Sequence, residues 1–162
     1  MFIHEFGHHF AGLGDEYYTS DVAYETGGSE HPEPWEPNLT ANGARPKWMG
    51  MVTQGTPLPT PWTKAAFEAH QREYQAERRK LREANVPETQ MDELFRREQE
   101  WETKFLSAEK YAKNVGAFEG AGYEAKGLYR PEADCIMFTR DEVGFCDVCT
   151  RAIVRMIEMQ TK

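Results

Sequence analysis

Hydrophobic residues recur at helical spacing near both ends of the chain. Phe2, Phe6 and Phe10 lie four residues apart, which predicts a helix over about residues 1–12 with these side chains on one face. Gly12 and Gly14 favour an end to that helix, because glycine readily adopts the left-handed conformation found at helix C-termini. A second helix is expected from about residue 141 to 159, and its apolar positions predict a buried face. Those positions are Phe145, Val148, Cys149, Ala152, Ile153, Met156 and Ile157.

A charged segment with thin apolar stripes occupies the middle of the chain, from residue 63 to 113. Its residues are strong helix formers, and Asn85-Val86-Pro87 interrupts them at a point where proline can begin a new helix. This pattern predicts an antiparallel helical hairpin. His70 within it is expected at the surface or the seam between the two helices.

The remaining segments lack periodicity. Residues 19–61 are rich in Pro and Gly, and we expect an irregular segment that Trp35, Trp48 and Trp62 anchor to the core. Residues 114–140 are punctuated by glycines, which predicts turns with a short strand.

The composition indicates a globular protein and narrows the classes of partner. The chain has 162 residues, of which 40% are hydrophobic, and a formal net charge of -8. This acidity argues against nucleic acid or an anionic membrane surface as a partner. No apolar run approaches the roughly 18 residues that span a bilayer, so no membrane insertion is expected.

The opening stretch carries the strongest chemical signal, His4-Glu5-Phe6-Gly7-His8. On a helix, residues i and i+4 lie on the same face, so His4 and His8 can direct one ring nitrogen each at a single Zn²⁺ ion. Glu5 is turned by about 100° from His4, which suits a general base for a water molecule and not a ligand.

A catalytic zinc usually takes a third protein ligand, which must follow the glycine turn here. Asp15 and Glu16 are the candidates, and adjacent residues of an extended segment point in opposite directions, so only one is expected to bind. We favour Asp15 because of its short side chain, while Glu16 stays open as the alternative. His9 is a further rival but is turned away from His8.

Several stretches resemble the IgA peptidase family of zinc metallopeptidases, which is similar to the metzincin clan of zincins. They are "HEFGHHFAGLGDEYY", "NLTANGARPKWMGMV", "TPLPTP", "GAFEGAGYEAKGLYRP" and "DCIMF…FCDVC". The resemblance covers residues 1–62 and 114–160. It implies that Met137 forms the methionine turn that packs beneath the metal. One departure is that Gly12 and Asp15 each lie one residue further from His8 than the usual metzincin spacing.

The resemblance implies an α+β fold, predominantly α in this chain. Residues 1–62 would supply the active-site helix and a long loop region of a zincin catalytic domain. Residues 63–113 would be an inserted helical hairpin, and residues 114–162 the methionine-turn region and C-terminal helix. Zincin domains carry a sheet before the active-site helix, so we expect this chain to be the C-terminal part of a longer catalytic domain.

The expected function is hydrolysis of peptide bonds in a protein or peptide substrate, with His4, His8 and Asp15 holding Zn²⁺ and Glu5 as general base. Tyr17, Tyr123 and Tyr129 are candidates for stabilising the oxyanion. The alternative is a non-catalytic zinc-bound fragment that acts as an interaction module through its hairpin. The resemblance also implies a secreted or cell-surface protein, although the chain shows no signal peptide.

Three cysteines, Cys135, Cys146 and Cys149, lie within the last 30 residues. Archaemetzincins have a similar pattern and hold a structural zinc with four cysteines, which three cysteines cannot reproduce. His31 could supply a fourth ligand, but its position in the sequence does not favour it. We therefore expect one disulfide, from Cys135 to either Cys146 or Cys149, with three reduced thiols as the alternative.

Overall fold

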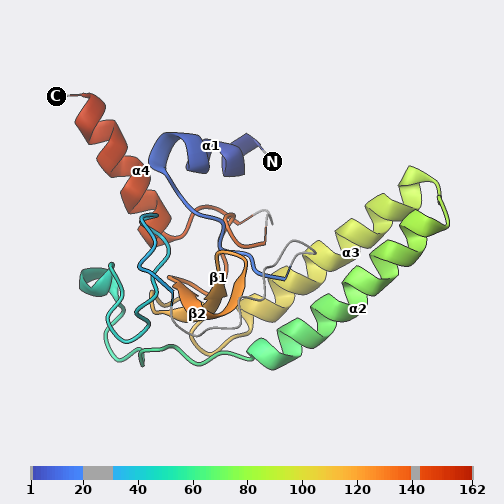
Figure 1. Cartoon of the computed structure of the whole chain (residues 1–162), viewed down its shortest axis with the longest axis horizontal. Coiled ribbons are helices and arrows are strands. Elements are labelled where there is room, and N and C mark those ends of the chain that lie inside the picture. The colour runs from blue at the N-terminus through green and yellow to red at the C-terminus, as the bar shows by residue number, and fades with distance from the viewer. Residues whose placement is uncertain (1, 20–30, 140–142, 162) are drawn as a thin grey trace.

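The computed structural model describes residues 2–19, 31–139 and 143–161. Within these ranges the fold is α+β and mostly helical, with four α-helices around one two-stranded antiparallel sheet (Figure 1). The elements are α1 (Phe2–Ala11), a 3-10 helix η1 (Met49–Met51), α2 (Lys64–Glu83), α3 (Glu88–Ser107), β1 (Phe118–Ala121), β2 (Glu124–Arg130) and α4 (Asp147–Gln160).

The β1–β2 hairpin lies at the centre of the molecule. Phe118 pairs with Arg130 and Ala121 with Glu124, and the register shifts between Glu119 and Ala121. Gly120 occupies this irregularity with a φ of 103°, a conformation that favours glycine. The expected short strand is therefore a complete hairpin.

The irregular segment over residues 31–61 packs along both edges of this hairpin. Isolated bridges join Thr40 to Tyr129 and Thr60 to Phe118. Trp48 is fully buried, and its indole N–H donates to the Gly116 carbonyl at 2.6 Å. The expected anchoring by tryptophans holds for Trp48 but not for Trp35, which is 78% exposed.

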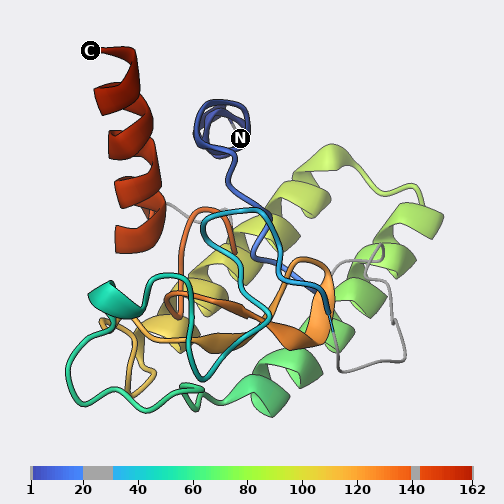
Figure 2. The same ribbon diagram turned by 60° about the vertical axis from the view of Figure 1, so that its left-hand side comes forward.

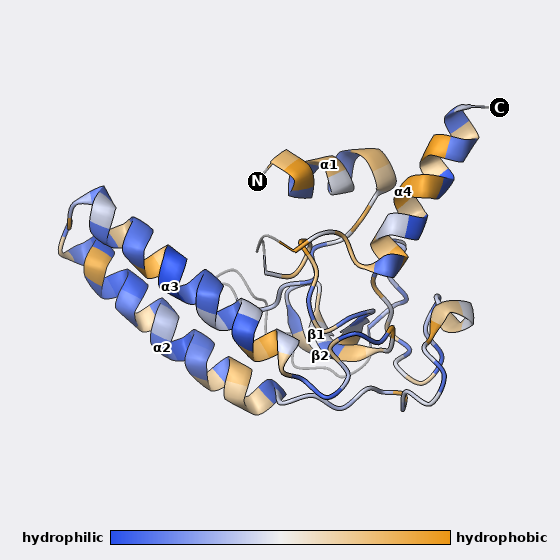
Figure 3. Cartoon of the chain, turned by 180° about the vertical axis from the view of Figure 1, so that it is seen from behind, coloured by the Kyte–Doolittle hydropathy of each residue, from blue (hydrophilic) through white to orange (hydrophobic). Residues whose placement is uncertain are grey.

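Helices α2 and α3 form the predicted hairpin and extend away from the sheet (Figure 1). Figure 3 shows that most of their length is hydrophilic. The base of the hairpin is different, because Phe67 and Leu106 are buried in the main core and the Phe67 ring lies 5.5 Å from that of Phe138. His70 stacks on Trp101 at the seam between the helices, with ring centroids 3.4 Å apart.

Helices α1 and α4 contact each other at the opposite end of the molecule (Figure 2). The buried face expected on the C-terminal helix is present only in its first half, where Ala152 and Ile153 pack against the core. The helix begins at Asp147, only Val148 and Cys149 within it are buried, and Ile157 is 48% exposed. Its later turns extend beyond the core, so their apolar residues have little to pack against.

The phenylalanine face of α1 is likewise turned largely towards the outside. Phe2 is 84% exposed and Phe6 40% exposed, while the opposite face of the helix is buried at His4 and Gly7. The side of α1 that packs on the protein is thus the side that carries the histidines. None of the helices in the described part of the chain has the length and apolarity needed to cross a bilayer.

Candidate metal centre

Three side chains from α1 and the following loop converge at one point. The Nε2 atoms of His4 and His8 are 3.0 Å apart, and each lies 3.1 Å from Oδ1 of Asp15. His4 is buried, whereas His8 and Asp15 are partly exposed. The three residues predicted as metal ligands therefore form one cluster with an open side.

Backbone carbonyls fix the orientation of both imidazole rings. Nδ1 of His4 lies 2.9 Å from the Ile136 carbonyl oxygen, and Nδ1 of His8 lies 2.6 Å from that of Leu13. A carbonyl only accepts hydrogen bonds, so each Nδ1 must carry the proton. The Nε2 lone pairs then point into the cluster, which is the arrangement that second-sphere partners impose on metal-binding histidines.

A glycine turn brings Asp15 back to the helix. Gly12 has a φ of 62°, and its N–H donates to the His8 carbonyl at 3.1 Å while that of Leu13 donates to the Gly7 carbonyl at 3.3 Å. The first bond, made by a glycine in the left-handed conformation, is that of an αL cap, and the second satisfies one more carbonyl at the end of α1. The chain beyond is held by a bond from the Glu16 N–H to the Met137 carbonyl at 2.8 Å.

Two of the three tyrosines considered from the sequence lie beside this cluster. The Tyr123 hydroxyl donates to Oδ2 of Asp15, and the Tyr17 hydroxyl lies 2.8 Å from that of Tyr123. Burial opposes ionisation of Asp15, but its contacts with His4 and Tyr123 favour the carboxylate and lower its pKa to about 2. Tyr129 instead packs its ring against Gly43, away from the histidines.

Glu16 faces away from the histidines. Its side chain is fully buried, and Oε1 accepts a hydrogen bond from Nδ2 of Asn38 at 2.9 Å. Burial raises the pKa of Glu16 well above its usual value, and Cys135 adds to this effect. Asp15, not Glu16, thus occupies the third position of the histidine cluster.

Asn38 holds the whole turn together. Its Oδ1 accepts from the Gly14 N–H at 2.8 Å, and its Nδ2 donates to the Gly14 carbonyl at 2.9 Å as well as to Glu16. In the sequence, Asn38 is only one residue of a stretch that resembles the IgA peptidase family. No local pattern shows that residue 38 returns to residue 14, so its role emerges only in three dimensions.

Met137 is fully buried against the underside of α1. A Cβ atom added to Gly7 would lie 3.1 Å from the Met137 sulfur and 2.9 Å from the Phe145 ring. Gly7 sits between the two histidines in sequence, so its missing side chain lets the methionine turn approach the helix closely. This placement agrees with the packing role expected for Met137.

The remaining polar residues of the motif lie on the outer side of α1. Glu5 is exposed, and its backbone carbonyl lies 3.0 Å from Nδ1 of His9. His9 is therefore directed along the helix and does not join the cluster. The Glu5 side chain is thus accessible to water.

A groove of about 420 Å³ opens beside the cluster. His8, Asp15 and Tyr123 contribute its polar wall, and Trp35, Leu39 and Leu128 contribute apolar surface. Part of this wall comes from the irregular segment, which thus shapes the surroundings of the histidines.

The three cysteines are buried free thiols, so the disulfide expected from the sequence is absent. The Sγ atoms of Cys135 and Cys149 are 3.9 Å apart, whereas a disulfide needs about 2.05 Å. Together with Glu16 they form a second cluster of side chains that could hold a metal ion.

The chain matches the family model for IgA peptidase M64 over residues 1–157. It belongs to this family. The match includes residues 63–113, which the resemblance noted in the sequence did not cover. A comparison with curated proteins gave no match. Membership implies a metallopeptidase, and hence a protein substrate.

Proposed function

We propose that this protein is a zinc-dependent endopeptidase in which His4, His8 and Asp15 hold the metal and Glu5 is the general base. The observation that carries the proposal is the convergence of two Nε2 lone pairs and a carboxylate oxygen within 3.1 Å of one another. Acceptor atoms at these distances repel one another, and a cation between them would remove that repulsion.

The donor set suits zinc in number and spacing. Zinc lies about 2.0–2.2 Å from imidazole nitrogen and carboxylate oxygen, so tetrahedral ligand atoms are separated by roughly 3.3 Å. The observed separations of 3.0 and 3.1 Å need only small adjustments. Three protein ligands and an open side are typical of a catalytic site, while structural sites use four.

The chemistry divides between the metal and the side chains. Zinc at this position would act as a Lewis acid that lowers the pKa of a water molecule and polarises the scissile carbonyl. Glu5 would accept the proton of the attacking water and pass it to the departing amine. Tyr17 or Tyr123 would turn its hydroxyl from its present partner and donate a hydrogen bond to the carbonyl oxygen as negative charge develops on it.

The groove beside the cluster is where we place the substrate. Its apolar residues Trp35, Leu39 and Leu128 would receive a side chain adjacent to the scissile bond, and Asp15 and Tyr123 border the reacting end. Most of Trp35 is exposed, so replacing it should affect substrate binding more than folding. Trp35→Ala is expected to raise KM and leave zinc content unchanged.

The decisive experiment is Glu5→Gln, assayed for zinc content and for hydrolysis of fluorescently labelled casein. The variant should keep its zinc and lose activity by about 10²–10⁴-fold, since it loses only a general base. Glu88→Gln, at an exposed position of the hairpin, is the matched control and should behave like the wild type. Loss of zinc in Glu5→Gln, or unchanged turnover, would contradict the role of Glu5.

Zinc content and casein hydrolysis of the wild-type protein also distinguish an endopeptidase from a non-catalytic zinc-bound fragment. A protein that binds zinc but hydrolyses no casein would favour an interaction module that works through the helical hairpin.

A further inference from the structure

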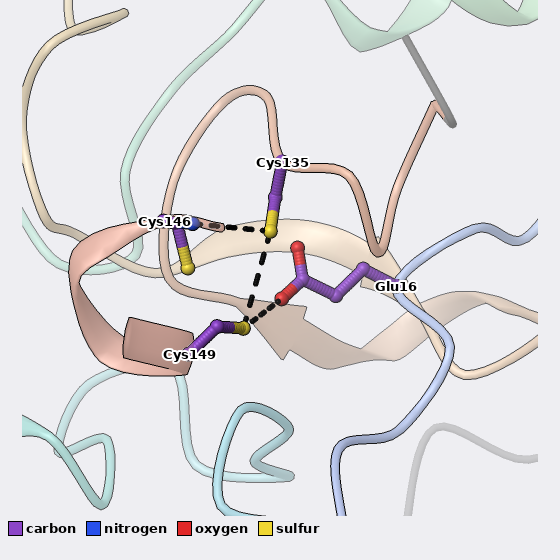
Figure 4. A group of neighbouring side chains, drawn as sticks. All are labelled: Glu16, Cys135, Cys146 and Cys149. Atoms are coloured by element: carbon purple, nitrogen blue, oxygen red, sulfur yellow. Dashed lines mark hydrogen bonds between the residues drawn. The ribbon is translucent and has the colours of Figure 1, made fainter. Parts of the chain in front are cut away.

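A second group of metal-binding side chains lies in the core, outside the histidine cluster. Glu16, Cys135, Cys146 and Cys149 come from three separate segments, and one ligand atom from each lies within 4.8 Å of all the others. Figure 4 shows the carboxylate and the three sulfurs facing a common centre. All four residues are buried, with Cys146 the most exposed at 5%.

The distances from the Cys149 sulfur to the Cys135 sulfur and to the Glu16 carboxylate match tetrahedral coordination. Zinc lies about 2.3 Å from thiolate sulfur and about 2.0–2.2 Å from carboxylate oxygen, which places sulfurs roughly 3.8 Å apart and sulfur roughly 3.5 Å from oxygen. The Sγ atoms of Cys135 and Cys149 are 3.9 Å apart, and Sγ of Cys149 is 3.4 Å from Oε1 of Glu16. Cys146 and Cys149 also have the Cys-x-x-Cys spacing common in zinc sites.

One carboxylate oxygen of Glu16 lacks a hydrogen-bond partner in this position. Its Oε2 atom is buried and has no hydrogen-bond partner among the residues that the structure describes. A buried carboxylate oxygen without a partner is costly, and a cation between the sulfurs would satisfy it.

The surroundings are those of a metal-bound thiolate. Backbone N–H groups of Cys146 and Met137 point at the Cys135 sulfur, at 3.3 and 3.5 Å. Asn38 orients the Glu16 carboxylate through its own hydrogen bond. Partners of this kind hold ligands in place around metals.

Positive charge near the cluster would offset its ligands. Three thiolates and one carboxylate exceed the charge of Zn²⁺ by two negative charges. Arg130 is fully buried and interacts electrostatically with both Glu16 and Cys135. The N-terminus of α4, which begins directly after Cys146, contributes further positive potential.

We propose that Glu16, Cys135, Cys146 and Cys149 bind a second zinc ion that has a structural role. Three cysteines exclude a four-cysteine site, but Glu16 supplies the missing fourth ligand. The ion would join the loop after α1, the methionine turn and the start of α4. Glu16 follows Asp15, and Cys135 precedes Ile136, whose carbonyl orients His4. The second site would therefore position the first.

The test is metal content and cobalt spectroscopy on the full chain. The double variant His4→Ala/His8→Ala removes the histidine site and should retain one zinc per chain. After exchange with Co²⁺ it should show a sulfur-to-cobalt charge-transfer band, which the histidine site cannot produce because it contains no sulfur. Cys146→Ser should abolish that band, and Glu16→Gln should weaken it.

A measurement on the wild type guards against misfolded variants. Titration of the thiols with an organomercurial, in the presence of a zinc-sensitive dye, should release one of two bound zinc ions. The second site would be overturned if the mercurial released no zinc. A double variant that binds no metal, or a disulfide in the unreduced protein, would overturn it as well. Absence of only the histidine-bound ion would overturn the proposed function and leave the second site standing.

Discussion

Asp15 and Glu16 are neighbours in the chain, yet their carboxylates belong to two different clusters. Oδ1 of Asp15 lies 3.1 Å from Nε2 of both His4 and His8, whereas Oε1 of Glu16 lies 3.4 Å from the Cys149 sulfur. The two side chains point to different clusters, so this dipeptide contributes one carboxylate to each.

This division predicts different results for two isosteric variants. Asp15→Asn should lose the zinc held by the histidines, because an amide is a far weaker ligand than a carboxylate, and should keep the cobalt–thiolate band. Glu16→Gln should keep zinc at the histidines. Zinc content and cobalt spectra of the two purified variants provide the check. The reverse pattern would mean that the carboxylates have been assigned to the wrong clusters.

The sequence was sufficient for the histidine cluster because its information is local. His4 and His8 share one helix face, and Asp15 follows a glycine turn of fixed geometry. The hairpin over residues 63–113 was likewise visible from helix formers on both sides of Pro87. Family resemblance added the methionine turn, which a lone Met137 would not have revealed.

What the sequence did not reveal depends on contacts between distant segments. The sequence pattern suggests Glu16 only for the histidine site and shows no favourable fourth ligand for the three cysteines, although the fold brings these four residues together. Asn38 meets Gly14 across 24 residues. The exposure of Ile157 and Phe6 was also missed, since an apolar stripe predicts burial without identifying a surface to pack on.

Tyr123 should tune the affinity of the histidine site through Asp15. Its hydroxyl donates to Oδ2 of Asp15, and removing a second-sphere hydrogen bond typically weakens metal binding by about 10–100-fold. Tyr123→Phe should raise the Kd for zinc by this factor in a chelator competition assay. Tyr129→Phe is the matched control, because that ring packs on Gly43. Equal effects of the two changes would show that the hydrogen bond is not responsible.

Gly7 should not tolerate a side chain. A Cβ atom there would lie 2.9 Å from Phe145 and 3.1 Å from both Leu13 and Met137, which is closer than packed atoms normally approach. Overpacking costs about 1–3 kcal/mol, and alanine recovers up to about 1 kcal/mol through helix propensity. We expect Gly7→Ala to lower the free energy of unfolding by about 1 kcal/mol in urea denaturation.

Gly50→Ala is the comparison for that variant, since an added Cβ would meet no atom within 4 Å. It should change the free energy of unfolding by less than about 0.5 kcal/mol. A Gly7→Ala protein as stable as the wild type would mean that the methionine turn is not closely packed on α1.

The outer part of the helical hairpin should be dispensable, but its base should not. Phe67 and Leu106 belong to the main core, and Gln71 donates to Glu98 at 2.6 Å near the base. Replacing residues 76–95 with a short Gly/Ser linker should leave zinc content and a cooperative thermal transition intact. Replacing residues 64–113 should abolish that transition, because it removes buried core side chains. If the longer deletion folds equally well, the hairpin is a separate unit.

Asn38 should contribute more to stability than its polar character suggests. Its amide bonds both the N–H and the carbonyl of Gly14 and also Glu16, and all three partners are buried. Asn38→Ala would leave the N–H and the carbonyl of Gly14 without a partner, at about 1–3 kcal/mol each before relaxation. We expect a loss of about 2–4 kcal/mol in urea denaturation, together with weaker zinc binding because Gly14 precedes Asp15.

Asn42→Ala removes only an exposed turn bond to the Arg45 N–H and should cost less than about 1 kcal/mol. Similar losses in the two variants would show that the turn before Asp15 does not depend on this buried amide.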